Sequence, residues 1–384
     1  MKKFTPKALS IFVIALLLQV GCSGDKEEVV DPDDSDNGGA QTEVEVQTLA
    51  TGLSHPWAMA FLPDGRLLVT ERVGRLRILD KSNKLSEPIG GVPEVFHQGQ
   101  GGLQDVALDP QFAQNGYVYF SYAEPGPNNT ASTALGRGKL ENDQITGFTV
   151  LFSQKPKVDG GNHFGSQVVF SPDGKIFLTL GERFKFEPAQ DLSNHLGTIV
   201  RLNKDGSVPS DNSFFNQQNA AKEIWSYGHR NVEAAAIEPA TGKLWVAEMG
   251  PKGGDELNQP ESGKNYGWPL VSWGEHYDGK DIADPTTRPE FADAKVHWTP
   301  VISPSGMRFY TGDMFAAFKG NMLIGGLSAK AVVRVQVTGD QAKEVGRIDL
   351  NARIRDVEQA PDGSIYALTD EDNGKVLRLI PKAN

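Results

Sequence analysis

From residue 43 onward the chain repeats one pattern of apolar and polar positions: an apolar strand, a tight turn, and a second strand in which apolar residues alternate. The clearest copies turn at Pro-Asp-Gly and cover residues 58–71, 168–180 and 357–369. Proline fixes φ there, and glycine supplies the left-handed position of the turn. Weaker copies cover 106–122, 235–247 and 307–335. Each copy predicts a β-hairpin.

Copies of one hairpin at intervals of about 50 to 70 residues are typical of propeller blades. The repeat therefore predicts an all-β fold, a six-bladed β-propeller built from four-stranded antiparallel blades. The alternative is a β-sandwich followed by a second domain, but a sandwich does not repeat one hairpin along the whole chain. The alternating segment 43–49 is expected to close the ring by pairing with residues 375–380. Residues 43–384 are thus expected to form one propeller domain.

The first 42 residues follow a different pattern. Three lysines among the first seven residues precede the apolar run 9–18, which is too short to span a bilayer and is typical of a secretory signal. Gly21 stands directly before Cys22, the only cysteine of the chain, and this arrangement resembles a bacterial lipoprotein cleavage site. We expect residues 1–21 to be a lipoprotein signal peptide and Cys22 to carry the lipid. The alternative is an ordinary signal peptide with an incidental cysteine.

Residues 22–42 are rich in Asp and Glu and nearly free of apolar side chains. Such a segment cannot bury enough surface to offset its ordering entropy, so we expect an acidic, disordered tether. The protein would then be exported, face the periplasm and touch a membrane only through its lipid, and Ser23 favours the outer membrane over the inner. The net charge of −11 offers no basic stripe for nucleic acid.

Two polar loops carry candidate chemistry. Gly160-Gly-Asn-His-Phe-Gly165 precedes the third hairpin, and its glycines leave the imidazole of His163 accessible, which suits a general base. The alternative is a turn residue bonded to backbone. In the second loop, Arg230 can clamp a carboxylate or stabilise an oxyanion, and the alternative is a structural salt bridge. For His195 the structural role is favoured.

The segments 248–256 and 265–269 combine Gly and Pro with carboxylates or aromatic residues. Backbone carbonyls beside carboxylates are the hard oxygen donors that calcium prefers. The sequence has no CxxC pair, no GxSxG motif and no nucleotide-binding glycine loop. Zinc, serine-hydrolase and nucleotide chemistry therefore lack support.

Taken in order, these loops resemble the soluble dehydrogenases of glucose and other aldoses that use pyrroloquinoline quinone (PQQ), over residues 47 to 381. Each of these sequence motifs alone has low specificity, but seven in the same order are specific to the fold family and fairly specific to the activity. The motifs are residues 53–61, 99–103, 162–165, 228–231, 250–258, 265–269 and 353–356.

The resemblance implies a role for each site residue. His163 would take the proton of the sugar's anomeric hydroxyl as hydride passes to the quinone, and Arg230 would stabilise the charge on the quinone oxygen. The cofactor, which carries three carboxylates, would be bound by Gln100, Asn162, Arg230, Asn231, Arg353 and Arg355.

Calcium enters on the same basis. The carbonyls of Gly250 and Pro251 would hold the Ca²⁺ that polarises PQQ, and Glu256 and Tyr266 match a second calcium position of the family.

Three segments depart from the family pattern. The familiar pair of histidines before Phe-Gly is Asn162-His163 here, although the position thought catalytic is retained. After the third hairpin the usual Gly-Asp-x-Gly is Gly181-Glu-Arg-Phe184, which we expect to narrow the mouth of the site or change the sugar admitted. After Asn231 the usual Pro-Gln-Gly is Val232-Glu-Ala234, which removes a polar contact and adds a charge near an anionic cofactor.

The sequence therefore predicts oxidation of an aldose to its lactone, with PQQ and calcium, and transfer of the electrons to a respiratory acceptor that it does not identify. The alternative is a propeller without cofactor that binds a glycan or a protein. Retention of His163, Arg230, Arg353 and Arg355 favours the enzyme, since a binding propeller does not need all of them. A hydrolase or lactonase would hold calcium deep in the central channel with side chains from several blades, and no such set is clear.

Overall fold

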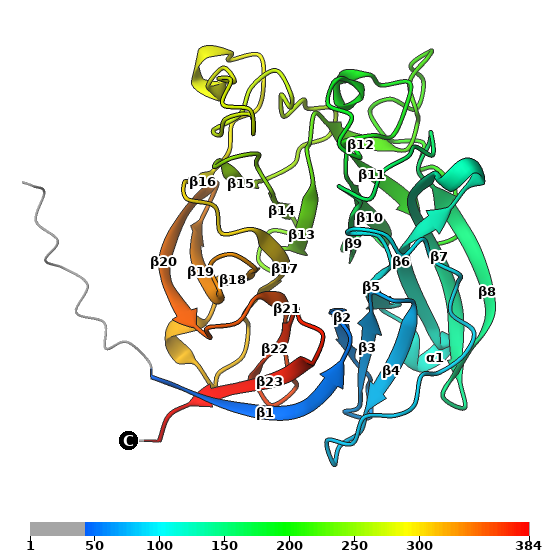
Figure 1. Cartoon of the computed structure of the whole chain (residues 1–384), viewed down its shortest axis with the longest axis vertical. Helices are drawn as coiled ribbons and strands as arrows, with labels where there is room; N and C mark the ends of the chain where they lie inside the picture. Colours follow the sequence, from blue (N-terminus) through cyan, green and yellow to red (C-terminus); the bar gives the residue numbers. More distant parts are fainter. Residues whose placement is uncertain (1–42, 384) are drawn as a thin grey trace, which may run out of the picture. The chain divides into compact units, whose positions relative to one another are not determined.

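Every hairpin predicted from the repeated phrase is present in the computed structural model, which describes residues 43–383. The signal peptide, the tether and the lipidation site Cys22 lie outside the described residues. The strands form six antiparallel sheets arranged around one centre (Figure 1), which confirms the six-bladed β-propeller.

Each sheet runs outward from an innermost strand, and the innermost strands of neighbouring sheets contact one another around the whole ring. These strands are β2 (Pro56–Phe61), β5 (Leu103–Leu108), β9 (Gly165–Phe170), β13 (Val232–Ile237), β17 (Pro304–Phe309) and β21 (Ile354–Gln359). The second strands are β3 (Leu67–Glu71), β6 (Tyr117–Pro125), β10 (Lys175–Leu180), β14 (Leu244–Glu248), β18 (Met322–Gly326) and β22 (Ile365–Thr369).

The outer strands complete the blades. The third strands are β4 (Arg75–Leu79), β7 (Ala131–Glu141), β11 (Thr198–Asn203), β15 (Asp255–Asn258), β19 (Ala331–Thr338) and β23 (Gly374–Pro381). The fourth are β8 (Gln144–Ser153), β12 (Ile224–Tyr227), β16 (Val296–Trp298), β20 (Gln341–Asp349) and β1 (Val44–Leu53). Helical turns within the described residues are short: α1 (Phe112–Asn115), η1 (Pro127–Asn129), η2 (Glu187–Gln190), η3 (Pro285–Thr287) and η4 (Ala316–Phe318).

One blade departs from the four-stranded prediction. The sheet of β2, β3 and β4 has three strands, and the chain after it forms only isolated bridges at Leu79–Leu85 and Leu76–Ile89. This following segment contains Pro88 and Pro93, which lack the amide hydrogen that a strand ladder requires.

The ring closes as the sequence predicted. Strand β1 pairs antiparallel with β23, with Val44 opposite Pro381 and Val46 opposite Leu379. The last blade therefore contains both the first and the last strand of the described chain.

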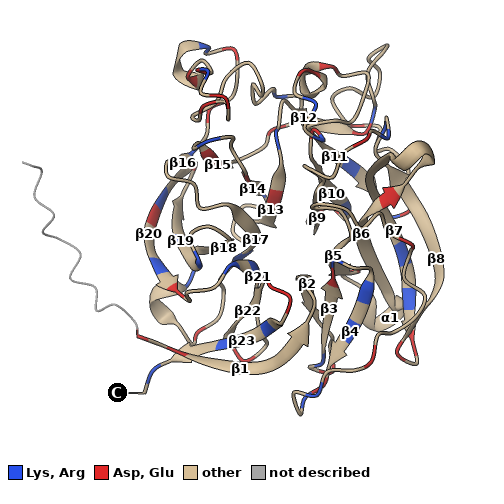
Figure 2. Ribbon diagram, viewed as in Figure 1, with Lys and Arg blue, Asp and Glu red and all other residues tan. Residues whose placement is uncertain are grey.

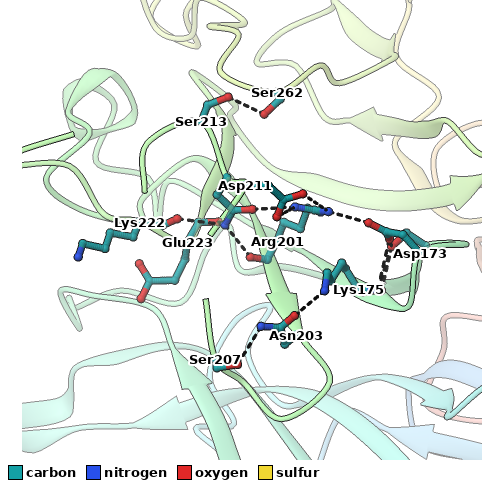
Figure 3. A network of polar contacts seen from close by, with 12 residues as sticks. Asp173, Lys175, Arg201, Asn203, Ser207, Asp211, Ser213, Lys222, Glu223 and Ser262 are labelled. Carbon is teal, nitrogen blue, oxygen red and sulfur yellow. Dashed lines mark hydrogen bonds and ion pairs between the residues drawn. The ribbon is translucent and has the colours of Figure 1, made fainter. Parts of the chain in front are cut away.

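The hydrophobic core is divided among the contacts between blades. Leu68 of β3 clusters with Phe120 of β6, and Trp245 of β14 clusters with Ile324 of β18. Each blade thus buries both of its faces against its neighbours, which is the packing that a propeller requires. A hydrogen-bond network centred on Arg201 (Figure 3) ties β11 to the hairpin turn at Asp173 (2.6 Å) and to Asp211 (3.0 Å) of the following loop.

A β-bulge interrupts the pairing at the beginning of every innermost strand. Bulges redirect side chains and are frequent beside active sites. The innermost-strand residues that lie in the six bulges, without a one-to-one partner on the next strand, are 57–58, 104–105, 166–167, 233, 305–306 and 355.

Among residues 43–383, no helix is long and apolar enough to cross a membrane.

Candidate active site

The predicted site residues gather where the innermost strands begin. Gln100 precedes β5, His163 precedes β9, Asn231 precedes β13 and Arg355 lies in β21. Oε1 of Gln100 accepts a hydrogen bond from the backbone N–H of His163 at 2.6 Å. Oδ1 of Asn231 accepts one from the N–H of Gly165 at 3.1 Å. Loops from several blades therefore meet at one face of the ring.

His163 is held in place by Glu182. The sequence predicted an accessible imidazole, but the ring is buried because Glu182 and Phe184 pack against it, and Nδ1 lies 2.5 Å from Oε1 of Glu182. A carboxylate can only accept, so the hydrogen of the neutral imidazole sits on Nδ1 and Nε2 keeps its lone pair. Burial lowers the pKa of His163 and outweighs the opposing effect of the hydrogen bond that the ring donates to Glu182. A neutral imidazole with a free Nε2 is what a general base requires.

Glu182 also fixes the turn that follows it. Its second oxygen accepts hydrogen bonds from the N–H groups of Lys185 and, at 2.8 Å, Phe186. Arg183, Phe184 and Phe186 all have positive φ, at 60°, 60° and 64°. Such a conformation costs a non-glycine residue on the order of 1 kcal/mol or more and persists only where the surroundings enforce it. One carboxylate therefore positions the histidine and stabilises a strained turn.

Arg183 points away from the mouth of the site. It is buried and donates to the carbonyl oxygens of Ala131 (2.6 Å), Asn162 (3.0 Å) and Gly160. Its guanidinium lies 3.8 Å from the centre of the Phe164 ring. Arg183 is thus the clamp of the loop that carries His163.

Phe184 stands beside the base. Its ring centre is 5.2 Å from that of His163, and 40% of the residue is exposed. With Arg230, Pro251 and Tyr277 it lines a cavity of about 280 Å³. The departure that begins at Glu182 therefore supplies an aromatic wall at the site, which is the position where the sequence predicted a narrowed mouth.

Arg230 lies buried between this cavity and the segment predicted to bind calcium. Its Nη1 donates to the carbonyl oxygens of Met249 (2.9 Å) and Gly250 (2.7 Å), and its Nη2 donates to the hydroxyl of Tyr277 at 3.3 Å. The Nε of Arg230 is buried without a hydrogen-bond partner among the described residues. Within residues 43–383 the hydrogen-bond partners of Arg230 are carbonyl and hydroxyl oxygens, so the structural salt bridge considered from the sequence is not found there.

The segment after β14 forms a cradle of carbonyl groups. A Cβ atom added to Gly250 would lie 2.2 Å from the carbonyl oxygen of Gly254 and 2.4 Å from that of Gly253. Asp255 accepts from the N–H of Gly250 at 2.9 Å, and burial raises the pKa of Asp255 to about 6. The backbone oxygens of Gly253 and Gly254 lie against Gly250, whose own carbonyl accepts from Arg230, so hard oxygen donors of the kind that calcium prefers gather beside the buried Pro251. No group of three or more His, Cys, Asp or Glu side chains within residues 43–383 is arranged to hold a metal, so carbonyl ligands would have to predominate.

Glu256 and Tyr266 line a second, very small cavity of about 10 Å³. Burial, with the nearby charge of Glu248, raises the pKa of Glu256 to about 8. Both carboxylates accept from the same amide of Asn258, at 3.1 Å and 3.2 Å. The hydroxyl of Tyr266 is committed to the carbonyl of Gln259 at 2.9 Å. A second calcium position here stays a prediction.

The two predicted cofactor arginines differ in their surroundings. Arg355 is buried, its Nη2 lies 2.9 Å from Asp370, and its guanidinium lies 4.1 Å from the centre of the Trp57 ring. Arg353 is half exposed and contacts Asp370 at 3.3 Å. Burial acts to raise the pKa of Asp370, but the charge of Arg355 and the hydrogen bonds from His55 and Arg355 outweigh it and hold that pKa well below its usual range.

Several polar atoms at this face suit an anionic ligand. The Nε atoms of Arg72 and Arg355 and the Nε2 atom of Gln104 are buried without hydrogen-bond partners among residues 43–383. Asn162 is exposed at the same face. Unpaired buried donors of this kind are uncommon, and a bound polyanion or ordered water would satisfy them. The residues present therefore fit a cofactor that carries carboxylates.

A larger cavity, about 790 Å³, contains none of these residues. It lies at the hairpin turns after β9 and β13, the opposite ends of the strands that begin at the site, and includes Asp173, Arg201, Trp225 and Lys243. Its size alone does not make it the active site.

His195 is structural, as favoured from the sequence. Its Nδ1 accepts from the N–H of Lys155 at 3.1 Å, and its Nε2 lies 3.3 Å from Glu223.

One recurring contact, between a carboxylate and a loop of the same blade, was not predicted from the sequence. In several blades a carboxylate at the end of the second strand binds the loop before the first strand, because the hairpin returns the chain to the same face. Besides Glu182, the examples are Glu71 with the N–H of Ser54 (2.6 Å), Glu248 with Nδ1 of His229 (2.9 Å) and Asp370 with Arg353 (3.3 Å). The signal available in the sequence was an acidic residue at or just after the end of these four predicted hairpins.

Comparison with known proteins identifies the family. The sequence model of the glucose/sorbosone dehydrogenase family matches residues 53–378. The chain is 44% identical over 355 residues to aldose sugar dehydrogenase YliI of Escherichia coli K12, an alignment that covers 89% of this chain and 94% of that protein. The crystal structure of the soluble E. coli aldose sugar dehydrogenase in its apo form superposes with a TM-score of 0.86 at 44% identity, covering 88% of this chain and all of the other.

A more distant structure is a PQQ-bound form. Aldose sugar dehydrogenase of Streptomyces coelicolor superposes with a TM-score of 0.71 at 26% identity and covers 88% of this chain and 99% of its own. The fold, the order of the loops and these matches agree with the resemblance seen in the sequence, and the chain belongs to the glucose/sorbosone dehydrogenase family.

Proposed function

We propose that this protein is an aldose dehydrogenase that oxidises the anomeric carbon of a sugar to a lactone, using PQQ and calcium. The observation that carries the proposal is the free Nε2 of a neutral His163, fixed by Glu182 and placed among loops that also present Arg230 and the carbonyls of Gly250 and Pro251. The E. coli relative is named an aldose sugar dehydrogenase, and this supports the substrate class.

His163 carries the proton chemistry. Its Nε2 takes the proton of the anomeric hydroxyl, and the positive charge that then develops on the ring is stabilised by Glu182 at 2.5 Å. PQQ, when bound with calcium, supplies the acceptor for the hydride. Arg230 places a fixed positive charge in a buried position beside the site, where it stabilises negative charge without reorganisation.

Binding and orientation belong to other groups. Gln100, Asn162, Asn231, Arg353 and Arg355 hold the cofactor in this proposal, and the carbonyls of Gly250 and Pro251 hold the calcium. A second calcium would use Glu256 and Tyr266.

The aromatic wall orients the sugar. Phe184 and Tyr277 present apolar faces at the cavity beside Arg230, and such faces pack against the C–H groups of a sugar ring while excluding water from the base.

We further propose that the protein is exported and anchored through a lipid on Cys22, with the propeller on the periplasmic side. The anchoring membrane is the outer rather than the inner membrane in this proposal. The electrons pass to a respiratory acceptor. Mass spectrometry of the intact mature chain tests this. We expect a lipid-modified N-terminal cysteine, and Cys22→Ala should release the protein from the membrane fraction.

The activity test is reconstitution. The whole chain, purified without cofactor, is supplied with PQQ and Ca²⁺, and dye reduction is followed with a panel of aldoses. We expect activity that requires PQQ and is lost in His163→Ala. A folded protein that binds no PQQ in calorimetry would overturn the proposal and favour the alternative, a propeller that binds a glycan or protein without cofactor.

A further inference from the structure

The carboxylate of Glu233 accepts hydrogen bonds from two of the residues assigned to the cofactor. Glu233 is the extra residue in the bulge at the start of β13 and is buried. Its Oε2 accepts from Nη1 of Arg355 at 2.7 Å, and its Oε1 accepts from the side-chain amide of Asn231 at 2.9 Å. The acidic position on β13 and the basic position on β21 are coloured in Figure 2.

The charge of Arg355 is already balanced before any ligand arrives. Glu233 pairs with one terminal nitrogen and Asp370 with the other, at 2.9 Å. Both carboxylates are buried with the arginine, so water screens the pairs little. A buried charge pair of this kind is lost only at considerable cost when one partner is removed or displaced.

An anionic cofactor would therefore meet a neutralised arginine. A carboxylate that approaches Arg355 gains its attraction and at the same time experiences repulsion from Glu233, and it must share or displace the amide of Asn231. Where the related pattern has Pro-Gln-Gly after the Arg-Asn pair, the uncharged Gln could accept the same hydrogen bonds without that repulsion.

We propose that Glu233 sets the affinity for PQQ, making cofactor binding weaker and more reversible than an uncharged residue at this position would. The proposal rests on the proposed function, since it assumes that PQQ is the ligand of this face. Glu233 acts through Arg355 and Asn231 and is a positioning residue that carries an opposing charge.

The test is calorimetric titration of PQQ into the whole chain in the presence of Ca²⁺, with thermal unfolding recorded for every variant. Glu233→Gln keeps the shape and an acceptor oxygen but removes the charge, and we expect its Kd for PQQ to fall by about tenfold or more. Glu358→Gln is the matched control, because Glu358 lies on the same strand as Arg355 but pairs with Arg308 at 2.6 Å, and its substitution should leave Kd unchanged.

The double variant Glu233→Gln/Arg355→Gln gives a second and independent answer, and it serves also if the single variant fails to fold. If the tighter binding of Glu233→Gln comes from the freed charge of Arg355, adding Arg355→Gln should abolish the gain and return Kd to within about threefold of the wild type.

Two results would overturn the proposal: a Glu233→Gln variant that is folded and binds PQQ no more tightly, or a double variant that binds about tenfold more weakly than the wild type. Absence of PQQ binding in the wild type and in every folded variant would instead contradict the proposed function itself, and is distinguishable from both.

Discussion

Nδ1 of His163 and Oε1 of Glu182 lie 2.5 Å apart, although 19 positions separate the two residues along the chain. The hairpin of β9 and β10 connects them, leaving the base at one end of its first strand and the carboxylate at the end of its second. The tautomer of the base is thus determined by the blade itself.

Glu182→Gln is expected to lower kcat by about 100-fold or more. A glutamine amide can donate to Nδ1, which favours the tautomer whose lone pair is on the wrong nitrogen, and it cannot stabilise the imidazolium. Steady-state dye reduction with a saturating aldose measures the effect. Glu187→Gln, in the same segment and exposed, is the control and should retain wild-type kcat. Equal losses in both variants would contradict the specific role of Glu182.

The pH dependence follows from the lowered pKa of His163. The base is active when neutral, so kcat/KM should stay constant above pH 6.5 and fall only at a midpoint below that ordinary value. The unfolded chain binds this proton at about pH 6.5 and the folded chain resists it, so the residue's contribution to stability is lost as pH falls below 6.5. A pH profile of kcat/KM with an acid midpoint above 6.5 would contradict the assignment.

Phe184→Gly should broaden the sugar specificity. Phe184 has φ of 60°, a conformation that glycine adopts freely, and its ring lies beside His163 and lines the adjoining cavity. We expect kcat/KM for a disaccharide such as maltose to rise several-fold relative to glucose. Phe184→Leu keeps the bulk and should preserve the wild-type ratio. An unchanged ratio in the glycine variant would show that the ring does not limit access.

Gly250→Ala tests the carbonyl cradle. The added methyl group would collide with backbone oxygens of Gly253 and Gly254, so the carbonyls must move apart. We expect the Ca²⁺ concentration at half-maximal activity to rise by about tenfold or more while the thermal unfolding transition stays cooperative. A calcium requirement identical to that of the wild type would place the ion elsewhere.

Leu53→Ala tests the closure of the ring. Leu53 is fully buried at the end of β1, where the first strand meets the last blade, and its truncation should lower the free energy of unfolding by about 3 kcal/mol. Val46→Ala, on the same strand but 44% exposed, should change it by less than about 0.5 kcal/mol. Urea unfolding of the two variants provides the comparison, and similar values would mean that the closure contributes little.

The sequence predicted the parts of the fold that local rules determine. A Pro-Asp-Gly turn between alternating strands favours a hairpin, and three such copies with three weaker ones identified the propeller and its closing strand. The missing fourth strand near Pro88 was not anticipated, because the repeat marks only the first two strands of each blade.

The site was predicted less completely. His163 and Arg230 could be selected because their loops are rich in glycine, but the partners of a side chain depend on which loops meet. The pair of Glu233 and Arg355 joins residues 122 positions apart, a separation that no local pattern reports. Sequence reasoning located a new charge at Glu233 but not the arginine that neutralises it.

The pairing of β1 with β23 also has a consequence for the order of folding. The first strand can pair only after the last strand has been synthesised. The sixth blade therefore depends on a contact between residues far apart in the sequence, and such contacts form slowly. Arg353 and Arg355 belong to that blade. A chain interrupted before β21 would therefore lack both arginines even where every earlier blade had already formed.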